Sequence, residues 1–116
     1  MIKLPLKDIE KMVIGQGLKV THRDFLIEGV STDSRKIREG QLFIPLIGEN
    51  FNGHKFIEEV IEKGAIATLW DKNEPIPNID FPFILVEDTL MALQQLAKEY
   101  RKRLNVKVIG ITGSNG

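Results

Sequence analysis

The 116-residue sequence contains no cysteine and only two histidines. The lack of cysteine excludes a disulfide scaffold, a thiolate zinc site and a cysteine nucleophile, and two histidines are too few for a histidine-rich metal cluster. A net charge is also lacking, because 16 basic residues balance 16 acidic ones. This balance argues against a general nucleic-acid-binding protein, although one local site can still bind a small anion. We therefore expect neither a metal site nor a nucleic-acid partner.

No apolar run approaches the ~20 residues that span a bilayer, and residues 1–6 lack the apolar core of a signal peptide. We therefore expect a cytoplasmic protein without a membrane-inserted segment. Apolar residues make up 42% of the chain and charged residues 28%, which is typical of a folded globular protein. A chain of this length suffices for one ordinary domain with a sizeable core.

Apolar periodicity predicts alternating strands and helices. The expected strands cover residues 26–30, 42–47, 65–70, 83–86 and 106–111. The expected helices cover residues 5–13, 54–63 and 88–104. The run at 42–47 is almost continuously apolar, as in a strand that is buried on both faces. This order predicts an α/β fold in which helices pack on a sheet.

The expected strand at 106–111 leads directly into a glycine-rich end, made of Thr112, Gly113, Ser114, Asn115 and Gly116. A strand followed by a glycine-rich loop is how phosphate-binding sites are built, because glycines let backbone N–H groups approach the phosphate. The sequence stops before the lysine and the hydroxyl residue that a complete phosphate loop places next. A disordered tail or a hairpin turn fits the spacing equally well. An apolar strand with no element after it is an unusual end for a domain, so we expect this chain to be the front of a longer protein.

Two polar loops follow expected strands and are candidates for ligand binding. The first loop consists of Ser31, Thr32, Asp33, Ser34 and Arg35, and the second of Asn50, Phe51, Asn52, Gly53 and His54. The first offers hydroxyls for a base and a guanidinium for a phosphate, and the second offers amides for a pyrimidine edge and a ring for stacking. Tight turns that satisfy their own backbone also explain both patterns, and the residues alone favour that interpretation. His54 is not expected to be a catalytic base, because no serine or cysteine partner lies near it in sequence.

Taken in order, seven segments resemble the N-terminal part of the Mur ligases. They are G-V-S-T-D-S-R at 29–35, G-Q-L-F-I-P-L at 40–46, G-E-N-F-N-G-H-K-F-I at 48–57, G-A at 64–65, V-E-D-T at 86–89, L-Q-Q-L-A at 93–97 and I-G-I-T-G-S-N-G at 109–116. No single segment would suffice, but the ordered set is specific, and it covers almost the whole chain from residue 26 onward. Three features favour the MurF type, which adds D-alanyl-D-alanine to UDP-N-acetylmuramoyl-tripeptide, over the MurE type. They are S-T-D-S-R at 31–35, E-x-F-x-G-H at 49–54 and T-G-S-N-G at 112–116.

The resemblance implies a two-layer mixed sheet with packed helices over residues 1–104, which binds the UDP end of the substrate. It implies that residues 105–116 are the first strand and part of the phosphate loop of an ATP-binding domain. The uracil pocket would lie between the two polar loops. Thr32 and Ser34 would contact the uridine, and Asp33 and Arg35 would be either ligands or a structural pair. The whole enzyme would use ATP and Mg²⁺ to join its two substrates in peptidoglycan precursor synthesis.

The 116 residues alone lack the central-domain residues that bind Mg²⁺ or activate the acyl group in such an enzyme. We therefore expect no catalytic residue, no bound ATP or Mg²⁺ and no ligase activity in this chain, and we expect a monomer. Two other interpretations stay open. One is the corresponding part of a MurE-type ligase, which extends the dipeptide form of the nucleotide substrate. The other is a stand-alone, non-catalytic uridine-nucleotide-binding module.

Overall fold

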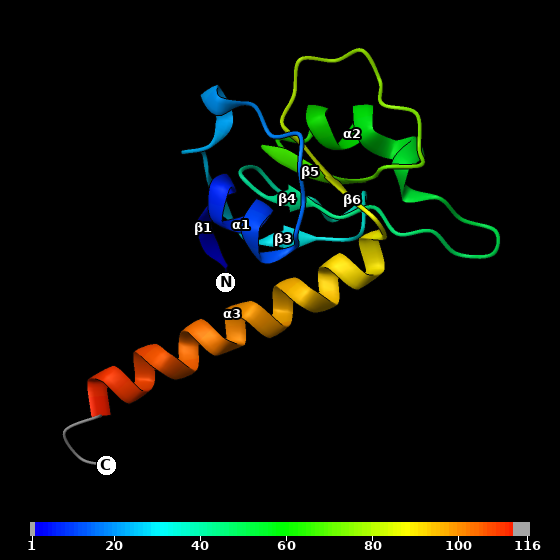
Figure 1. Cartoon of the computed structure of the whole chain (residues 1–116). Helices are drawn as coiled ribbons and strands as arrows, with labels where there is room; N and C mark the ends of the chain where they lie inside the picture. Colours follow the sequence, from blue (N-terminus) through cyan, green and yellow to red (C-terminus); the bar gives the residue numbers. More distant parts are fainter. Residues whose placement is uncertain (1, 113–116) are drawn as a thin grey trace.

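The computed structural model describes residues 2–112, with side chains described as far as Leu104. In this part of the chain, the central sheet has four strands in the order β3-β4-β5-β6, all of them parallel (Figure 1). They are β3 (Val30–Ser31), β4 (Leu42–Phe43), β5 (Ala67–Asp71) and β6 (Phe83–Val86). A separate antiparallel pair consists of β1 (Lys3–Pro5) and β2 (Leu26–Glu28). The order of the central sheet follows the chain, so each strand lies beside the next one in sequence.

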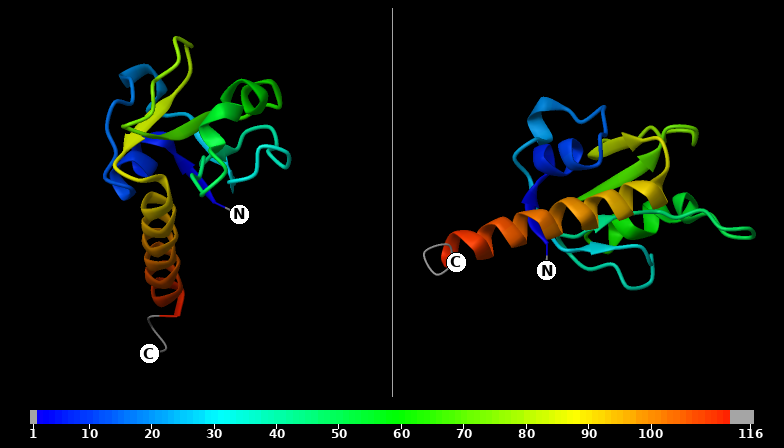
Figure 2. Two further views of the ribbon diagram at one scale, coloured as in Figure 1. Left: turned by 90° about the vertical axis from the view of Figure 1, so that its right-hand side faces the viewer. Right: turned by 60° about the horizontal axis from the view of Figure 1, so that its bottom comes forward.

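Helices cover both faces of this sheet. They are α1 (Leu6–Met12), the 3-10 helices η1 (Val20–His22) and η2 (Gly53–Phe56), α2 (Ile57–Glu62) and α3 (Thr89–Thr112). Residues of α1 and α3 belong to the apolar cluster on one face, and residues of α2 belong to the cluster on the other face (Figure 2). The sheet therefore lies between two layers of helix.

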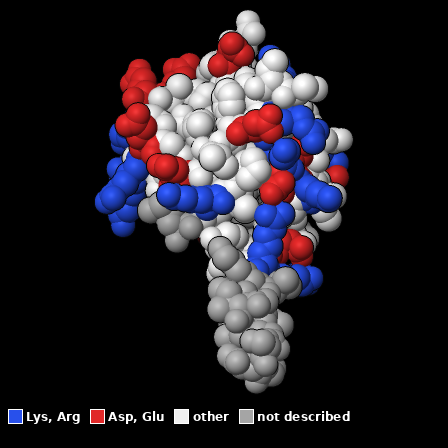
Figure 3. All heavy atoms as spheres, turned by 90° about the vertical axis from the view of Figure 1, so that its left-hand side faces the viewer, with Lys and Arg blue, Asp and Glu red and all other residues white. Residues whose placement is uncertain are grey.

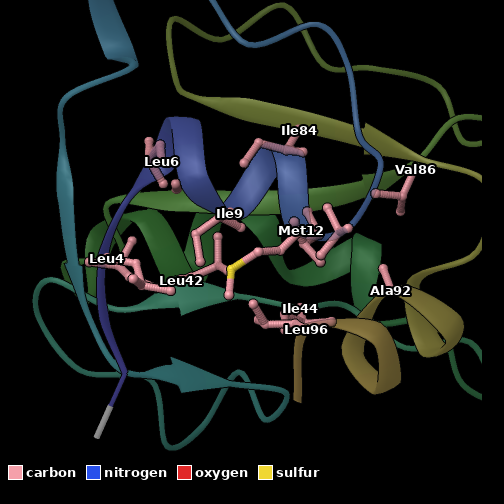
Figure 4. Packing of buried hydrophobic residues seen from close by; sticks show 14 residues of the cluster. Leu4, Leu6, Ile9, Met12, Leu42, Ile44, Ile84, Val86, Ala92 and Leu96 are labelled. Carbon is pink, nitrogen blue, oxygen red and sulfur yellow. The ribbon is translucent and has the colours of Figure 1, made fainter. Parts of the chain in front are cut away.

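Successive side chains of the strands enter opposite clusters. On β4, Leu42 packs with α1 and α3, while Phe43 packs with α2, and on β5 Leu69 and Trp70 are divided in the same way. Figure 4 shows the larger cluster, with Leu6, Ile9 and Met12 of α1 facing residues of the sheet and α3. Burying one Leu, Ile or Phe side chain contributes about 1.5–3 kcal/mol, so both faces stabilise the sheet.

The α/β class predicted from the sequence is confirmed, and the layers differ from those expected. Helices on both faces give three layers rather than two, because apolar parallel strands need cover on both sides. The central sheet is wholly parallel, and the antiparallel pairing is confined to β1 and β2. The expected strand at 26–30 is divided at Gly29, whose φ of 98° is left-handed. Glycine adopts this conformation without steric cost, so the chain leaves the β1–β2 pair here and enters the central sheet.

The predicted strand at 106–111 is wrong, because α3 continues as one helix from Thr89 to Thr112. Figure 1 shows the end of this helix reaching away from the sheet, and no strand of the described residues pairs there. An isolated strand would leave its backbone N–H and C=O groups unpaired, whereas a helix pairs them internally. The predicted phosphate loop lies outside the described residues apart from Thr112, the last residue of α3. The domain boundary expected after residue 104 stays a prediction.

Candidate functional site

Both polar loops lie on the connections that leave neighbouring parallel strands. The first loop follows β3, and the second lies in the connection from β4 to η2, which projects from the domain in Figure 1. The carboxyl ends of parallel strands meet at one edge of a sheet, which is where ligands of open α/β sheets bind. At this edge lies a hollow of about 720 Å³, lined by Thr32, Asp33, Ser34, Arg35, Phe51, Phe56 and Glu59. The two predicted loops therefore meet in space.

The first loop is ordered by hydrogen bonds to the Asp33 carboxylate. Asp33 Oδ1 accepts from the Arg35 backbone N–H at 2.8 Å and from Arg35 Nε at 3.2 Å, and Oδ2 accepts from Nη2 at 3.2 Å. The hydrogen bonds from the Arg35 side chain do most to lower the pKa of Asp33, and the bond from the Arg35 backbone N–H lowers it further. The contact between the two side chains also raises the pKa of Arg35. Ser31 Oγ accepts from the Asp33 backbone N–H. The Arg35 side chain stays 84% exposed at the rim of the hollow, where it remains accessible to an anion.

The second loop is held from inside by Asn52 and His54. Asn52 Oδ1 accepts from the His54 backbone N–H at 2.9 Å and lies 2.8 Å from His54 Nδ1. His54 Nε2 accepts from the Asp71 backbone N–H at 3.1 Å, so the proton of the neutral ring is on Nδ1. The His54 ring meets the Trp70 ring edge-on, with the two ring centroids 4.5 Å apart. Burial lowers the pKa of His54, and the nearby Glu74 and Asp71 partly oppose this effect.

The hollow gathers half of the predicted contact residues. Thr32 to Arg35 and Phe51 line it. The residues outside its lining are Ser31, Asn50, Asn52, Gly53 and His54. Gly53 packs against the backbone, since a Cβ there would lie 3.1 Å from both Leu46 N and Pro45 Cα. A uridine contact by any of the ten residues stays a prediction.

Three residues at this edge were not predicted as part of the site. Phe56 stacks on Phe51, with ring centroids 5.9 Å apart and planes inclined by 25°, and Glu59 lines the same hollow. Lys63 Nζ donates to the Ser34 carbonyl at 3.1 Å and to Glu59 Oε2 at 3.2 Å. The helical spacing of Phe56 and Glu59, three residues apart, is a sequence signal that they share a side of the helix. The contact from Lys63 to Ser34 has no such local signal.

Two kinds of feature are absent from the described part of the chain. Its residues include no group of three His, Asp or Glu side chains placed to hold a metal ion. Its helices include none with the length and apolar character required to cross a bilayer.

The chain matches known proteins along its whole length. The family model described as the catalytic domain of the Mur ligase family matches residues 26–101. Over 116 residues, the chain is 51% identical to the UDP-N-acetylmuramoyl-tripeptide–D-alanyl-D-alanine ligase of Bacillus subtilis (strain 168). The match covers 100% of this chain and 25% of that relative. The chain thus spans about a quarter of the length of this relative.

Two solved structures share the fold. MurF from Acinetobacter baumannii superposes with a TM-score of 0.77 at 26% identity, over 89% of this chain and 22% of that one. MurF ligase from Thermotoga maritima, solved in complex with ADP, superposes with a TM-score of 0.54 at 33% identity, over 62% of this chain and 16% of that one. Because the family model covers most of the chain and the Bacillus relative matches all of it, the chain belongs to the Mur ligase family.

Proposed function

We propose that this chain is the substrate-binding N-terminal domain of an ATP-dependent ligase of the MurF type. The whole enzyme would join D-alanyl-D-alanine to UDP-N-acetylmuramoyl-tripeptide in the cytoplasmic synthesis of peptidoglycan precursors. The observation that carries this proposal is the hollow lined by residues of both polar loops. The Bacillus relative is named for this reaction, which supports the MurF type over the MurE type.

The lining of the hollow suits a uridine nucleotide. Phe51 is 50% exposed and stacked on Phe56, so it offers a face for a uracil ring. Thr32 and Ser34 supply hydroxyls that both donate and accept hydrogen bonds. The Arg35 guanidinium suits a diphosphate, and its contact with Asp33 orders it before the ligand arrives.

The part of this domain in the reaction is positioning. ATP would supply the phosphoryl group that activates the terminal carboxylate of the peptide for attack by the amine of D-alanyl-D-alanine. The described residues contain no carboxylate and histidine group suited to Mg²⁺, so we assign them no role in holding the metal. They hold the uridine end while the peptide end reaches the reacting groups. The chain alone therefore binds UDP weakly and has no ligase activity.

A titration of the ¹⁵N-labelled 116-residue chain with UDP tests this proposal. We expect the amides of residues 32–35 and of Phe51 to shift and to saturate at millimolar UDP. ADP at the same concentration is the control, because it shares the ribose and the diphosphate but lacks uracil, and it should cause smaller shifts. If UDP moved no amide in either loop, the hollow would not be a uridine site. Both ligase types bind the same uridine end, so this experiment tests the domain and not the type.

A further inference from the structure

The end of α2 contacts both halves of the connection from β3 to β4, which forms one wall of the hollow. At the start of this connection, Lys63 Nζ donates to the Ser34 carbonyl at 3.1 Å. At its end, the Gly64 carbonyl accepts from the Gly40 backbone N–H at 2.8 Å. The helix that follows the second loop therefore also holds the first loop.

Gly64 allows the close approach on which these contacts depend. Its φ is 102°, and a Cβ at this position would lie 2.8 Å from Glu39 Cα. A residue with a side chain would therefore push the helix end away from the connection. Lys63 precedes this glycine directly, so the backbone packing brings its ammonium close to Ser34.

The ammonium of Lys63 lies between two acceptors. Besides the Ser34 carbonyl, it donates to Glu59 Oε2 at 3.2 Å, one helical turn earlier. Glu59 itself lines the hollow. The carboxylate thus restrains the lysine side chain, which is 39% exposed, in the position from which it reaches Ser34.

The first loop has few other polar links to the rest of the domain. The Ser31 carbonyl, at the end of β3, accepts from the Ile44 N–H, and, apart from the Lys63 contact, the hydrogen bonds of residues 32–36 run among residues 31–36 themselves. Among the described residues, the contact from Lys63 is the hydrogen bond that ties residues 32–36 to another element. Loss of this contact would free the loop to move relative to Phe51 on the opposite wall.

We propose that Lys63 is a positioning residue of the substrate site. It holds the Ser34 carbonyl so that the hydroxyls of Thr32 and Ser34 and the guanidinium of Arg35 face the ligand in one arrangement. A loop ordered before binding loses less conformational freedom when the ligand arrives, so its affinity is higher. This inference rests on the proposed function, since it assigns Lys63 a role in the same uridine site.

Four variants of the 116-residue chain, compared with the wild type by UDP titration, test the proposal. Lys63→Met keeps the length of the side chain and removes its charge and donors, and should weaken UDP binding roughly 5- to 10-fold, the effect of about one hydrogen bond. Lys63→Arg keeps donors for the carbonyl and should recover most of the affinity. Lys72→Met is the matched control, because Lys72 forms a similar exposed pair with Glu87 at 2.6 Å, outside the lining of the hollow. Glu59→Gln removes the ion pair but leaves the lysine, and should weaken binding less than Lys63→Met.

Amide hydrogen exchange separates loop positioning from general stability. The Lys36 N–H donates to the Asp33 carbonyl within the loop, and the Leu42 N–H donates to the Gly29 carbonyl in the sheet. Lys63→Met should speed exchange at Lys36 and leave Leu42 unchanged, and Lys63→Arg should restore protection at Lys36. If Lys63→Met bound UDP like the wild type, or if Lys63→Arg were as weak as Lys63→Met, Lys63 would not position the site. If the wild type failed to bind UDP while Lys36 exchange responded as expected, the proposed function would be wrong and the link to the loop correct.

Discussion

At the scale of single residues, His54 braces the second polar loop against β5. Its ring donates from Nδ1 to Asn52 and accepts at Nε2 from the Asp71 backbone N–H. A protonated ring has donors on both nitrogens, so it would lose the contact with Asp71. Burial separately lowers the pKa of His54, because removal from water disfavours the charged form of the ring.

The first prediction concerns the pH dependence of stability. Because the folded pKa of His54 lies below its ordinary value of 6.5, the unfolded chain binds more protons in the window between the two. The free energy of unfolding is therefore highest above pH 6.5 and falls as the pH drops from 6.5 toward the folded pKa. Urea unfolding at pH 7.5 and 5.5 measures the difference, two conditions chosen to straddle the ordinary histidine value of about 6.5.

Two substitutions test whether His54 causes this pH dependence of the free energy of unfolding. His54→Gln should reduce the difference between the two pH values and should cost about 1–3 kcal/mol at the higher pH, because the buried partners lose their contacts. His22→Gln replaces the other histidine and should leave the difference in place. An unchanged pH dependence in His54→Gln would show that the ring does not carry it.

The second prediction concerns Gly64. Gly64→Ala places a Cβ 2.8 Å from Glu39 Cα at a left-handed φ of 102°. We expect a loss of about 1–3 kcal/mol in the free energy of unfolding, measured with urea. Gly48→Ala is the control, because its nearest neighbour, Phe51 Cβ, would be 3.9 Å away, and it should cost less than about 0.5 kcal/mol. Equal losses in the two variants would contradict the close approach at the end of α2.

At the scale of elements, α3 joins the core through one side of its first half. Leu96 is 1% exposed and belongs to the cluster shown in Figure 4, whereas Met91 is 67% exposed. The third prediction is that Leu96→Ala lowers the free energy of unfolding by about 2–5 kcal/mol, while Met91→Ala lowers it by less than about 0.5 kcal/mol. Urea unfolding of both variants measures the two losses in the free energy of unfolding. Similar losses would mean that α3 packs on the core through a different side of the helix.

The sequence predicted best those elements whose patterns are local. The apolar stripe at 54–63 and the cap at Gly64 located η2 and α2, where Ile57 and Val60 are buried and Gly64 has a left-handed φ. The strand predicted at 83–86 agrees with β6. The strand predicted at 106–111 was wrong because a short apolar run fits a strand and a helix equally well. Whether such a run forms a strand depends on pairing with a strand that is distant in sequence.

The site was predictable in part, for a related reason. The two polar loops carry dense local motifs, and the sequence alone could show that each follows a strand. Which of their side chains face the hollow depends on tertiary packing, so the inward turn of His54 and the reach of Lys63 to Ser34 left no local pattern. These contacts join residues up to 29 positions apart.

At the scale of the whole molecule, one sheet connects the two apolar clusters. Trp70, the only tryptophan of the chain, is 2% exposed and lies in the smaller cluster, while Leu69 beside it lies in the larger one. The fourth prediction is that Trp70 fluorescence and far-ultraviolet circular dichroism report the same urea midpoint. Midpoints that differed would show that the two faces unfold separately.

Charge on the molecular surface is mixed at short range. Figure 3 shows acidic and basic side chains close together over one face, and exposed pairs such as Lys7 with Asp24 are part of this pattern. Surface pairs of this kind contribute little to stability. The chain has no net charge, so attraction of the diphosphate in the proposed ligand would come from individual residues such as Arg35 rather than from the field of the whole domain.

The lining of the hollow comes from one uninterrupted stretch, from Thr32 to Glu59, because the sheet order follows the chain order. One continuous segment of the chain therefore supplies the whole lining, and successive connections form the two walls. The proline-containing connection between β5 and β6 contributes no residue to this lining, so substitutions or insertions there should leave the lining unchanged. Conversely, exchanging residues 32–64 between related domains would transfer the lining of the hollow, the strand that separates its walls and the end of α2 that holds the first loop.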